Sequence, residues 1–246
     1  MIEPKLCRES VHPRGLAQYV KFRMEFDANH PDYFYPDGLC IFVGPQGSGK
    51  TLSAVNYVYK LLDAYPRSIL VSNLKLTDYP FDGKCVHLFE DNDDFSRYSN
   101  EEQGVIFLVD EIQLYLNSLQ SKNINLEVVA QISQQRKQRV HIVATSQVFG
   151  RMAKPLREQF STVMLCTAKA NCLQVNYWLD RDSIESQDNG ATALTGEVKE
   201  KFVWWRTPEM FARYDTSYVI RRKQWAGGEK KLEVYVDGSG TVRTGV

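Results

Sequence analysis

The chain has 246 residues, 43% of them hydrophobic, with 30 basic and 30 acidic side chains. This length suits one large domain, or one domain with an appendage. The balanced charge excludes a protein that attracts polyanions through its overall charge, so any nucleic-acid contact must come from local basic patches. The cysteines form no CxxC pair, which argues against a zinc site or a redox motif, and no run of about eighteen apolar residues indicates a transmembrane helix.

The first 38 residues are rich in aromatic and charged side chains, with four scattered prolines. We interpret residues 1–38 as an N-terminal extension that packs on the core or on a neighbouring subunit. From residue 39 the pattern changes. The run LCIFV (39–43) predicts a buried strand, and residues 50–64 predict an amphipathic helix with one apolar face, formed by Leu52, Val55, Val58, Tyr59 and Leu62.

Between that strand and that helix lies GPQGSGKT (44–51), which fits the pattern G-x-x-x-x-G-K-[ST]. Glycines let several backbone N–H groups point at one anion, and the helix N-terminus adds its positive end. Lys50 would reach the β- and γ-phosphates of a nucleotide, and the Thr51 hydroxyl would ligate Mg²⁺. A chance glycine-rich loop is disfavoured by the flanking elements. The predicted nucleotide-binding residues are Gly44, Pro45, Gln46, Gly47, Ser48, Gly49, Lys50, Thr51 and Leu52.

Short apolar strands then alternate with helical segments. Strands are expected at 68–73, 84–89, 105–109, 139–147 and 162–167, and helices at 112–119 and 125–137. This alternation is typical of an α/β fold with a mostly parallel sheet covered by helices on both faces, here a P-loop NTPase core over residues 39–170. Strands at 173–179 and 201–206, and a hairpin around Asp237–Gly240, predict a β-rich C-terminal appendage over residues 171–246.

Two acids, Asp110 and Glu111, follow the most apolar strand, VIFLV. In P-loop ATPases an acid at this place holds Mg²⁺, and a second acid can polarise the attacking water. We therefore expect ATP or GTP hydrolysis, with Asp110 as a metal residue and Glu111 as the base, on a strand next to that of the glycine loop. The alternative is a helix N-terminus stabilised by two acids.

Further polar residues follow other strands. Gln147, at the end of VATSQ, could sense the γ-phosphate or orient water, or be a solvated loop residue. Asn73 could hold Glu111 away from water. Arg136, Lys137 and Arg139 precede the VATSQ strand, and three interpretations stay open: a solvated face, a DNA-facing patch, or an arginine finger acting on the next subunit's nucleotide. In the last interpretation the arginines would face the next subunit, with that strand on the far side of the sheet order from the glycine loop, as the family resemblance described below implies.

The succession GPQGSGKTLSAV, ILVSNLKL, VIFLVDEIQLYL, QQRKQRVHIVATSQ and PLREQFSTVMLC resembles the zonula occludens toxin-like (Zot) family of phage morphogenesis ATPases. That family is similar to the FtsK–HerA superfamily, which includes viral packaging ATPases. The resemblance covers roughly residues 39–170. It implies ATP and Mg²⁺ as ligands, ATPase roles for Lys50, Thr51, Asp110, Glu111 and Gln147, an arginine finger at Arg136 or Arg139, and a homo-oligomeric ring, often a hexamer, that moves DNA.

Many filamentous-phage members carry a transmembrane helix after the core, and this sequence shows none. A genome-packaging motor docked at a capsid vertex in the host cytoplasm therefore fits better than a membrane-anchored ATPase. The alternatives are a phage-export ATPase that reaches the membrane through a partner protein, a small-molecule kinase, and a regulatory nucleotide switch. Candidate DNA contacts lie C-terminal to the core: Lys169, Arg181, Arg221, Arg222, Lys223, Lys230 and Lys231.

Overall fold

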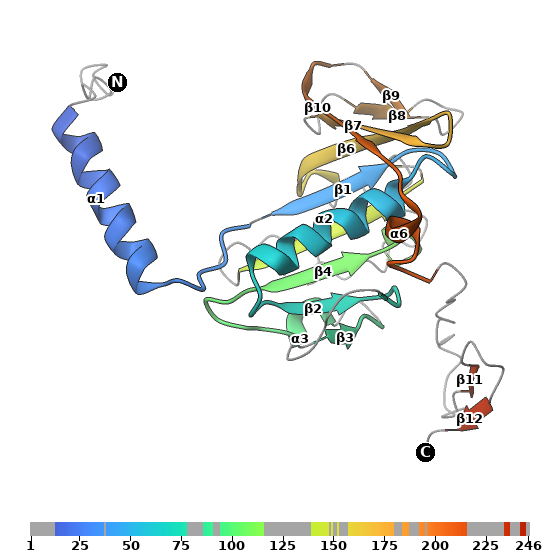
Figure 1. Ribbon diagram of the computed structural model, residues 1–246, viewed down its shortest axis with the longest axis horizontal. Coiled ribbons are helices and arrows are strands. Elements are labelled where there is room, and N and C mark those ends of the chain that lie inside the picture. Colours follow the sequence, from blue (N-terminus) through green and yellow to red (C-terminus); the bar gives the residue numbers. More distant parts are fainter. Residues whose placement is uncertain are drawn as a thin grey trace, which may run out of the picture.

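The structure, a computed structural model, describes residues 13–36, 38–77, 86–90, 94–115, 139–147, 149, 152, 157–179, 184–186, 192–194, 196–215, 234–236 and 242–244. Within them one eight-stranded sheet has the order β10-β7-β6-β1-β5-β4-β2-β3 (Figure 1). Its strands are β1 (Leu39–Val43), β2 (Ile69–Ser72), β3 (Val86–Leu88), β4 (Val105–Val109), β5 (Val140–Ser146), β6 (Phe160–Lys169), β7 (Leu173–Leu179) and β10 (Val198–Trp205).

The strands from β6 to β3 in that order run parallel to one another, whereas β7 and β10 add antiparallel. The central strands β1, β4 and β5 are buried along their whole length, as expected for a parallel sheet covered on both faces. The expected mostly parallel sheet is confirmed.

The position of β5 corrects two expectations about strand neighbours. β4, which carries the acidic pair, was expected next to β1, but β5 lies between them. β5 was also expected on the far side of the sheet order from the glycine loop, and it is instead the direct partner of β1. The spacing of motifs along the chain does not determine strand order, because each crossover can pass over a strand that the chain has yet to form.

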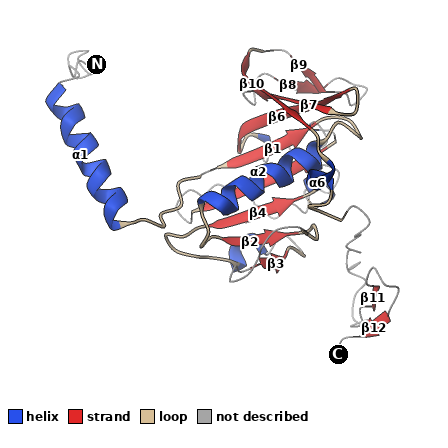
Figure 2. Ribbon diagram, in the orientation of Figure 1, coloured by secondary structure: helices blue, strands red, loops and turns tan. Residues whose placement is uncertain are grey.

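Helical segments pack on both faces of the sheet, as predicted, and Figure 2 shows α2 lying across one of them. The helix α2 (Lys50–Ala64) packs on one face, and all five apolar residues expected on its inner side are buried. On the other face, Phe95 of α3 (Asp94–Arg97) and Ile112 of the 3₁₀ turn η2 (Ile112–Leu114) join the core. The helix expected over 112–119 thus starts as this turn. Its residues 116–119, and the helix expected over 125–137, lie outside the described residues.

The sheet continues beyond residue 170, where the core was expected to end. β7 and β10 extend it along the free edge of β6, so the first strands of the expected appendage belong to the core sheet. The chain then forms the short helix α6 (Pro208–Phe211) beside α2 (Figure 1). Two separate two-stranded sheets are β8 (Ile184–Ser186) with β9 (Thr192–Leu194), and β11 (Val234–Val236) with β12 (Val242–Thr244). The last pair is antiparallel, as the predicted C-terminal hairpin requires.

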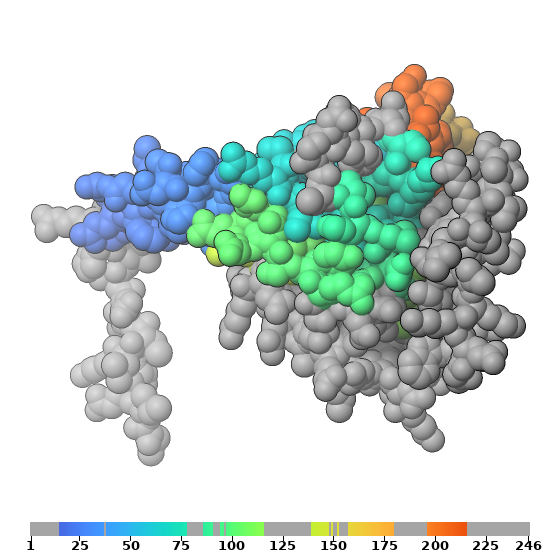
Figure 3. All heavy atoms as spheres, turned by 90° about the horizontal axis from the view of Figure 1, so that it is seen from below, coloured from blue at the N-terminus to red at the C-terminus, as the bar shows by residue number. Residues whose placement is uncertain are grey.

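The N-terminal extension contains a helix that the sequence analysis did not anticipate, α1 (Pro13–Asn29). Pro13 is its first residue and Pro31 follows its end, so these prolines bracket the helix rather than interrupt it. Residues just after α1 attach it to the core: Phe34 is buried against Tyr65, and Arg67 pairs with Asp32 at 2.6 Å. The helix α1, in blue, lies at one end of the molecule (Figure 3).

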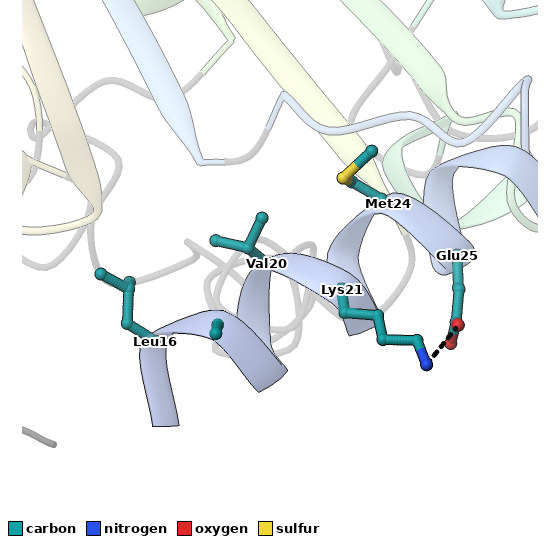
Figure 4. Close-up of a pocket in the computed structure, with 6 residues that line it drawn as sticks. Leu16, Val20, Lys21, Met24 and Glu25 are labelled. Carbon is teal, nitrogen blue, oxygen red and sulfur yellow. Dashed lines mark ion pairs between the residues drawn. The ribbon is translucent and has the colours of Figure 1, made fainter. Parts of the chain in front are cut away.

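A shallow hollow runs along α1, lined by Leu16, Ala17, Val20, Lys21, Met24 and Glu25 (Figure 4). Lys21 and Glu25 pair across one helical turn at 3.7 Å. The apolar side chains beside them are largely exposed; Leu16, for example, is 62% exposed. None of the helices in the described part of the chain combines the length and apolar character that crossing a membrane requires.

Candidate active site

The glycine loop lies at the carboxyl end of β1, the edge where open α/β sheets bind ligands. Gly44, Gly47 and Gly49 have φ angles of 148°, 78° and 85°, in the range that favours glycine. The loop closes through a hydrogen bond from the Ser48 N–H to the Pro45 carbonyl at 3.2 Å. The buried Ser48 hydroxyl has no partner among the described residues. A loop of this shape leading into a helix N-terminus suits a phosphate group.

Lys50, the first residue of α2, is only 6% exposed. Its ammonium donates a hydrogen bond to the Pro45 carbonyl at 3.2 Å, so the side chain folds back over the loop. The cation is therefore held at the phosphate loop, where it would meet the β- and γ-phosphates of a nucleotide.

Asp110 connects the glycine loop with two other strands. Its Oδ1 accepts a hydrogen bond from the Thr51 hydroxyl at 2.9 Å and another from the Thr145 hydroxyl at 2.7 Å. Thr51 belongs to α2, Asp110 follows β4, and Thr145 lies near the end of β5. Hard oxygen donors are what Mg²⁺ prefers, so Thr51 and Asp110 fit the expected metal site.

The Asp110 carboxyl is partly buried. Burial, the largest cause, raises the pKa of Asp110, while the hydrogen bonds from Thr145 and Thr51 oppose that rise. The negative charge of Glu111 also raises this pKa, and Lys50 lowers it. A partly buried carboxylate whose charge is not fully compensated favours a cation beside it.

The Glu111 carboxylate has hydrogen-bond partners different from those of Asp110. Its backbone has a φ of 51°, a left-handed conformation that is costly for a residue with a side chain. Its N–H donates to the Thr145 hydroxyl at 2.9 Å, and its carboxylate accepts hydrogen bonds from Gln147, at 3.0 Å, and from Gln113. These contacts hold the carboxylate in one orientation, and they place the predicted base and the predicted sensor Gln147 together.

Asn73 follows β2 and supports Asp110 rather than the Glu111 carboxylate. Its amide group accepts from the Asp110 N–H at 2.8 Å and donates to the Asp110 carbonyl at 2.9 Å. This pair of hydrogen bonds satisfies both backbone groups at the end of β4, as a further strand would. The hydrogen bonds of Asn73 therefore position Asp110, and they do not support its expected role of holding Glu111 away from water.

Three contributing residues were missed by sequence reasoning: Thr145, Gln174 and Arg206. Thr145 lies two residues before Gln147 in VATSQ and so shares its face of the strand. Gln174 is fully buried on β7 and donates to the Ser48 carbonyl at 3.1 Å. Arg206 follows β10 and donates to Gln174. No motif marks the last two residues, since the sheet alone brings them to the loop.

The segment after Arg206 passes over α2 near the site. Tyr59 of α2 donates to the Arg213 carbonyl at 2.9 Å, and Arg213 donates to Asn56 at 2.8 Å. Tyr214 pairs with Leu76 in an isolated antiparallel bridge. Burial raises the pKa of Tyr214, with the charge of Asp110 adding to the rise and that of Arg206 opposing it.

The basic residues predicted as arginine fingers or DNA contacts are not among these site residues, and most of them lie outside the described residues. Arg139 precedes β5, at the end of the sheet opposite the glycine loop, and its guanidinium stacks 3.6 Å above the Tyr33 ring. Arg136 and Lys137 lie outside the described residues, as do six of the seven candidate DNA contacts. The seventh, Lys169, is exposed at the carboxyl end of β6, which runs parallel to β1. The structure thus brings together the loop, Asp110, Glu111 and Gln147, whereas Arg139 lies at the opposite end of the sheet.

No protein-family model matches the chain, and no curated protein does. Similar solved structures include the N-terminal domain of zonular occludens toxin from Neisseria meningitidis, at 16% identity over 74% of this chain and 100% of that chain, with a TM-score of 0.46. A second similar structure is genome-packaging NTPase B204 from Sulfolobus turreted icosahedral virus 2, in complex with ATP-gammaS. It is 13% identical over 67% of this chain and 99% of that chain, with a TM-score of 0.46. The flagellar accessory protein FlaH from Methanocaldococcus jannaschii is 12% identical over 72% and 89%, with a TM-score of 0.45.

The first two structures belong to the groups that the order of the motifs resembles. The class of the protein follows from its own strand order, the glycine loop between β1 and α2, and the acids after β4. The chain has the α/β fold of P-loop NTPases.

We predict that Asp110→Asn raises the free energy of unfolding of the nucleotide-free protein at neutral pH. Because the native pKa of Asp110 is raised, its contribution to stability is lost as pH rises from the usual aspartate range, about 3.9, through the native value. Asparagine carries no such charge, and its oxygen can still accept from both threonines. Urea denaturation should therefore show a stability gain for the variant that grows with pH and then levels off. A gain that is absent, or equal at acidic and neutral pH, would contradict the assigned environment of Asp110.

Proposed function

We propose that this protein is an ATP-hydrolysing motor that couples hydrolysis to DNA translocation, and that it packages a viral genome. The observation that carries the ATPase part is the 2.9 Å hydrogen bond from Thr51 to Asp110. It brings the loop that would bind phosphate and the acid that would hold the metal into one site, with Glu111 beside them.

Each described residue of the site has a distinct part in the proposed reaction. The loop N–H groups and Lys50 bind and orient the triphosphate. The Thr51 hydroxyl and Asp110 hold Mg²⁺, which would neutralise charge on the β- and γ-phosphates. Glu111 accepts a proton from the attacking water, and Gln147, bonded to Glu111 at 3.0 Å, orients that carboxylate. Gln113 restrains the other carboxylate oxygen.

The support for DNA as the partner is the motif order, which resembles ATPases that move DNA. The overall charge is balanced, so the contact would be made by a local group of cations. Of the candidate contacts, Lys169 lies exposed at the carboxyl end of β6, toward the edge that carries the glycine loop. A place at a packaging vertex in the host cytoplasm, rather than in a membrane, belongs to the same proposal.

We further propose that the subunits form a ring in which Arg136 or Arg139 acts on the neighbouring subunit's nucleotide. Arg139 lies at the opposite end of the sheet from its own glycine loop, so it cannot reach the phosphates of its own subunit. β5 spans seven residues, or about 23 Å at 3.3 Å per residue. A finger at this position therefore works only if a second subunit brings its site to that end.

The division of labour between the two acids gives one prediction. Glu111→Gln should still bind Mg·ATP but hydrolyse it at least ~100-fold more slowly, as expected for the loss of a general base. Asp110→Asn should also weaken Mg²⁺-dependent binding, because it removes a metal ligand. Titration calorimetry with ATP, with and without Mg²⁺, together with phosphate-release rates, measures both effects. Equal binding defects in the two variants would show that these roles are wrongly assigned.

Assembly gives a second prediction. Because an arginine supplied by a neighbour contributes about 10³–10⁵ in turnover, ATPase activity should rise steeply with protein concentration, or on adding DNA that nucleates a ring. Mixing Lys50→Ala subunits with Arg136→Ala or Arg139→Ala subunits should recover part of the lost activity.

Two results would count against this assembly. A site shared between subunits would be excluded if dilute monomers hydrolysed ATP as fast as assemblies do, and if mixed oligomers that demonstrably form recovered no activity. Phosphate transfer to a small acceptor, without stimulation by DNA, would instead indicate a kinase.

A further inference from the structure

The buried amide of Gln174 makes as many hydrogen bonds as its groups allow. Its Nε2 donates to the Ser48 carbonyl at 3.1 Å and to Asn176 Oδ1 at 2.7 Å. Its Oε1 accepts from Arg206 Nε at 2.9 Å and from Arg206 Nη2 at 2.5 Å. A carboxamide has two N–H donors and one oxygen with two lone pairs, so all four positions are occupied.

This arrangement leaves the Gln174 amide only one orientation. If the amide turned over, its NH₂ group would face the Arg206 guanidinium, which only donates, and its oxygen would face two acceptors. The acceptor role of Asn176 Oδ1 is reinforced by Ser53, whose hydroxyl donates to it at 3.2 Å. Because Gln174 is fully buried, water cannot replace a lost partner, and an unpaired group there is costly. Arg206 and the Ser48 carbonyl therefore select the same orientation of the Gln174 amide.

The orientation of Gln174 in turn constrains the glycine loop. The amide of Gln174 holds the Ser48 carbonyl, and in a planar trans peptide the following N–H points the opposite way. The Gly49 N–H, one of the loop donors at the start of α2, is thereby directed away from Gln174. There is no room for a side chain between these groups, since a Cβ on Gly49 would lie 2.1 Å from Gln174 Oε1 and 2.3 Å from Arg206 Nη2.

We propose that Arg206 and Gln174 are positioning residues that fix the Ser48–Gly49 peptide in the orientation required for phosphate binding. The inference rests on the proposed nucleotide-binding function and adds a site element from outside the known motifs. Both residues come from the antiparallel extension, Gln174 on β7 and Arg206 just after β10. The Arg206 N–H donates to the Cys172 carbonyl at 2.7 Å, which ties the end of β10 to the start of β7. The extension therefore acts as a support for the phosphate loop.

The test compares four variants for binding of Mg·ATPγS and ADP by calorimetry, and for amide hydrogen exchange in residues 44–51. Arg206→Met removes the donors but keeps much of the side-chain length. Gln174→Glu keeps the acceptor for Arg206, as a stronger ion pair, but loses the donor to the Ser48 carbonyl. Arg206→Lys restores a charge and a single donor. Lys201→Met is the matched control, because Lys201 is an exposed cation on the same strand, β10.

Arg206→Met and Gln174→Glu should each weaken binding of both nucleotides by about tenfold or more and speed amide exchange in the loop. Arg206→Lys should recover part of the affinity, and Lys201→Met should match the wild type. Gln174→Glu is the decisive variant, since a merely structural link between β7 and β10 would survive it. If the wild-type protein binds nucleotide, and both Arg206→Met and Gln174→Glu bind it with the same affinity, the inference about Arg206 and Gln174 is wrong but the proposed nucleotide binding is not affected. A wild-type protein that binds no nucleotide would overturn the proposed function as well.

Discussion

The hydrogen bonds that Thr51 and Thr145 donate to one oxygen of Asp110 are the contact on which the rest of the site depends. They join three elements at the carboxyl ends of the parallel strands: the helix after the glycine loop, the end of β4, and the end of β5. In the order β1-β5-β4, Thr145 reaches Asp110 because β5 lies directly beside β4. The same threonine accepts the Glu111 N–H at 2.9 Å, so one hydroxyl positions both acids.

The site is supported from both sides of these strands. On one side Asn73, at the end of β2, satisfies both backbone groups of Asp110. On the other, Gln174 and Arg206 support the Ser48–Gly49 peptide. These polar groups are largely buried, so each depends on a specific partner rather than on water. The left-handed backbone of Glu111 is stable only because the surrounding contacts determine it.

Sequence reasoning predicted most of what depends on local pattern. Strands 39–43 and 105–109 and the helix 50–64 have the predicted bounds, because continuous apolar runs and helical periodicity are properties of the segments themselves. The sequence assigned Thr51, Asp110, Glu111 and Gln147 to one nucleotide site. The structure joins Thr51 to Asp110 and Gln147 to Glu111, because the parallel strands that carry these residues all end on the same side of the sheet.

The features that sequence reasoning missed depend on how the strands and helices are arranged in three dimensions. The order of β5 and β4 is set by crossovers, which leave no mark in local periodicity. Gln174 and Arg206 reach the loop only because antiparallel strands were added to the edge of β6, so neither lies in a recognisable motif. α1 was missed because its flanking prolines were taken as scattered, although Pro13 occupies the first helical position, where proline is favoured.

The central claim is that Thr51 and Asp110 form the metal-binding part of one nucleotide site. A crystal structure of the protein with Mg·ATPγS tests it most directly. We expect phosphates enclosed by residues 44–51 and a metal bound to the Thr51 hydroxyl. The 2.9 Å hydrogen bond between Thr51 and Asp110 should be replaced by contacts of both side chains to that metal or its water. Nucleotide bound elsewhere, or a nucleotide-filled loop in which Thr51 still donates directly to Asp110 and the metal lies away from both, would contradict it.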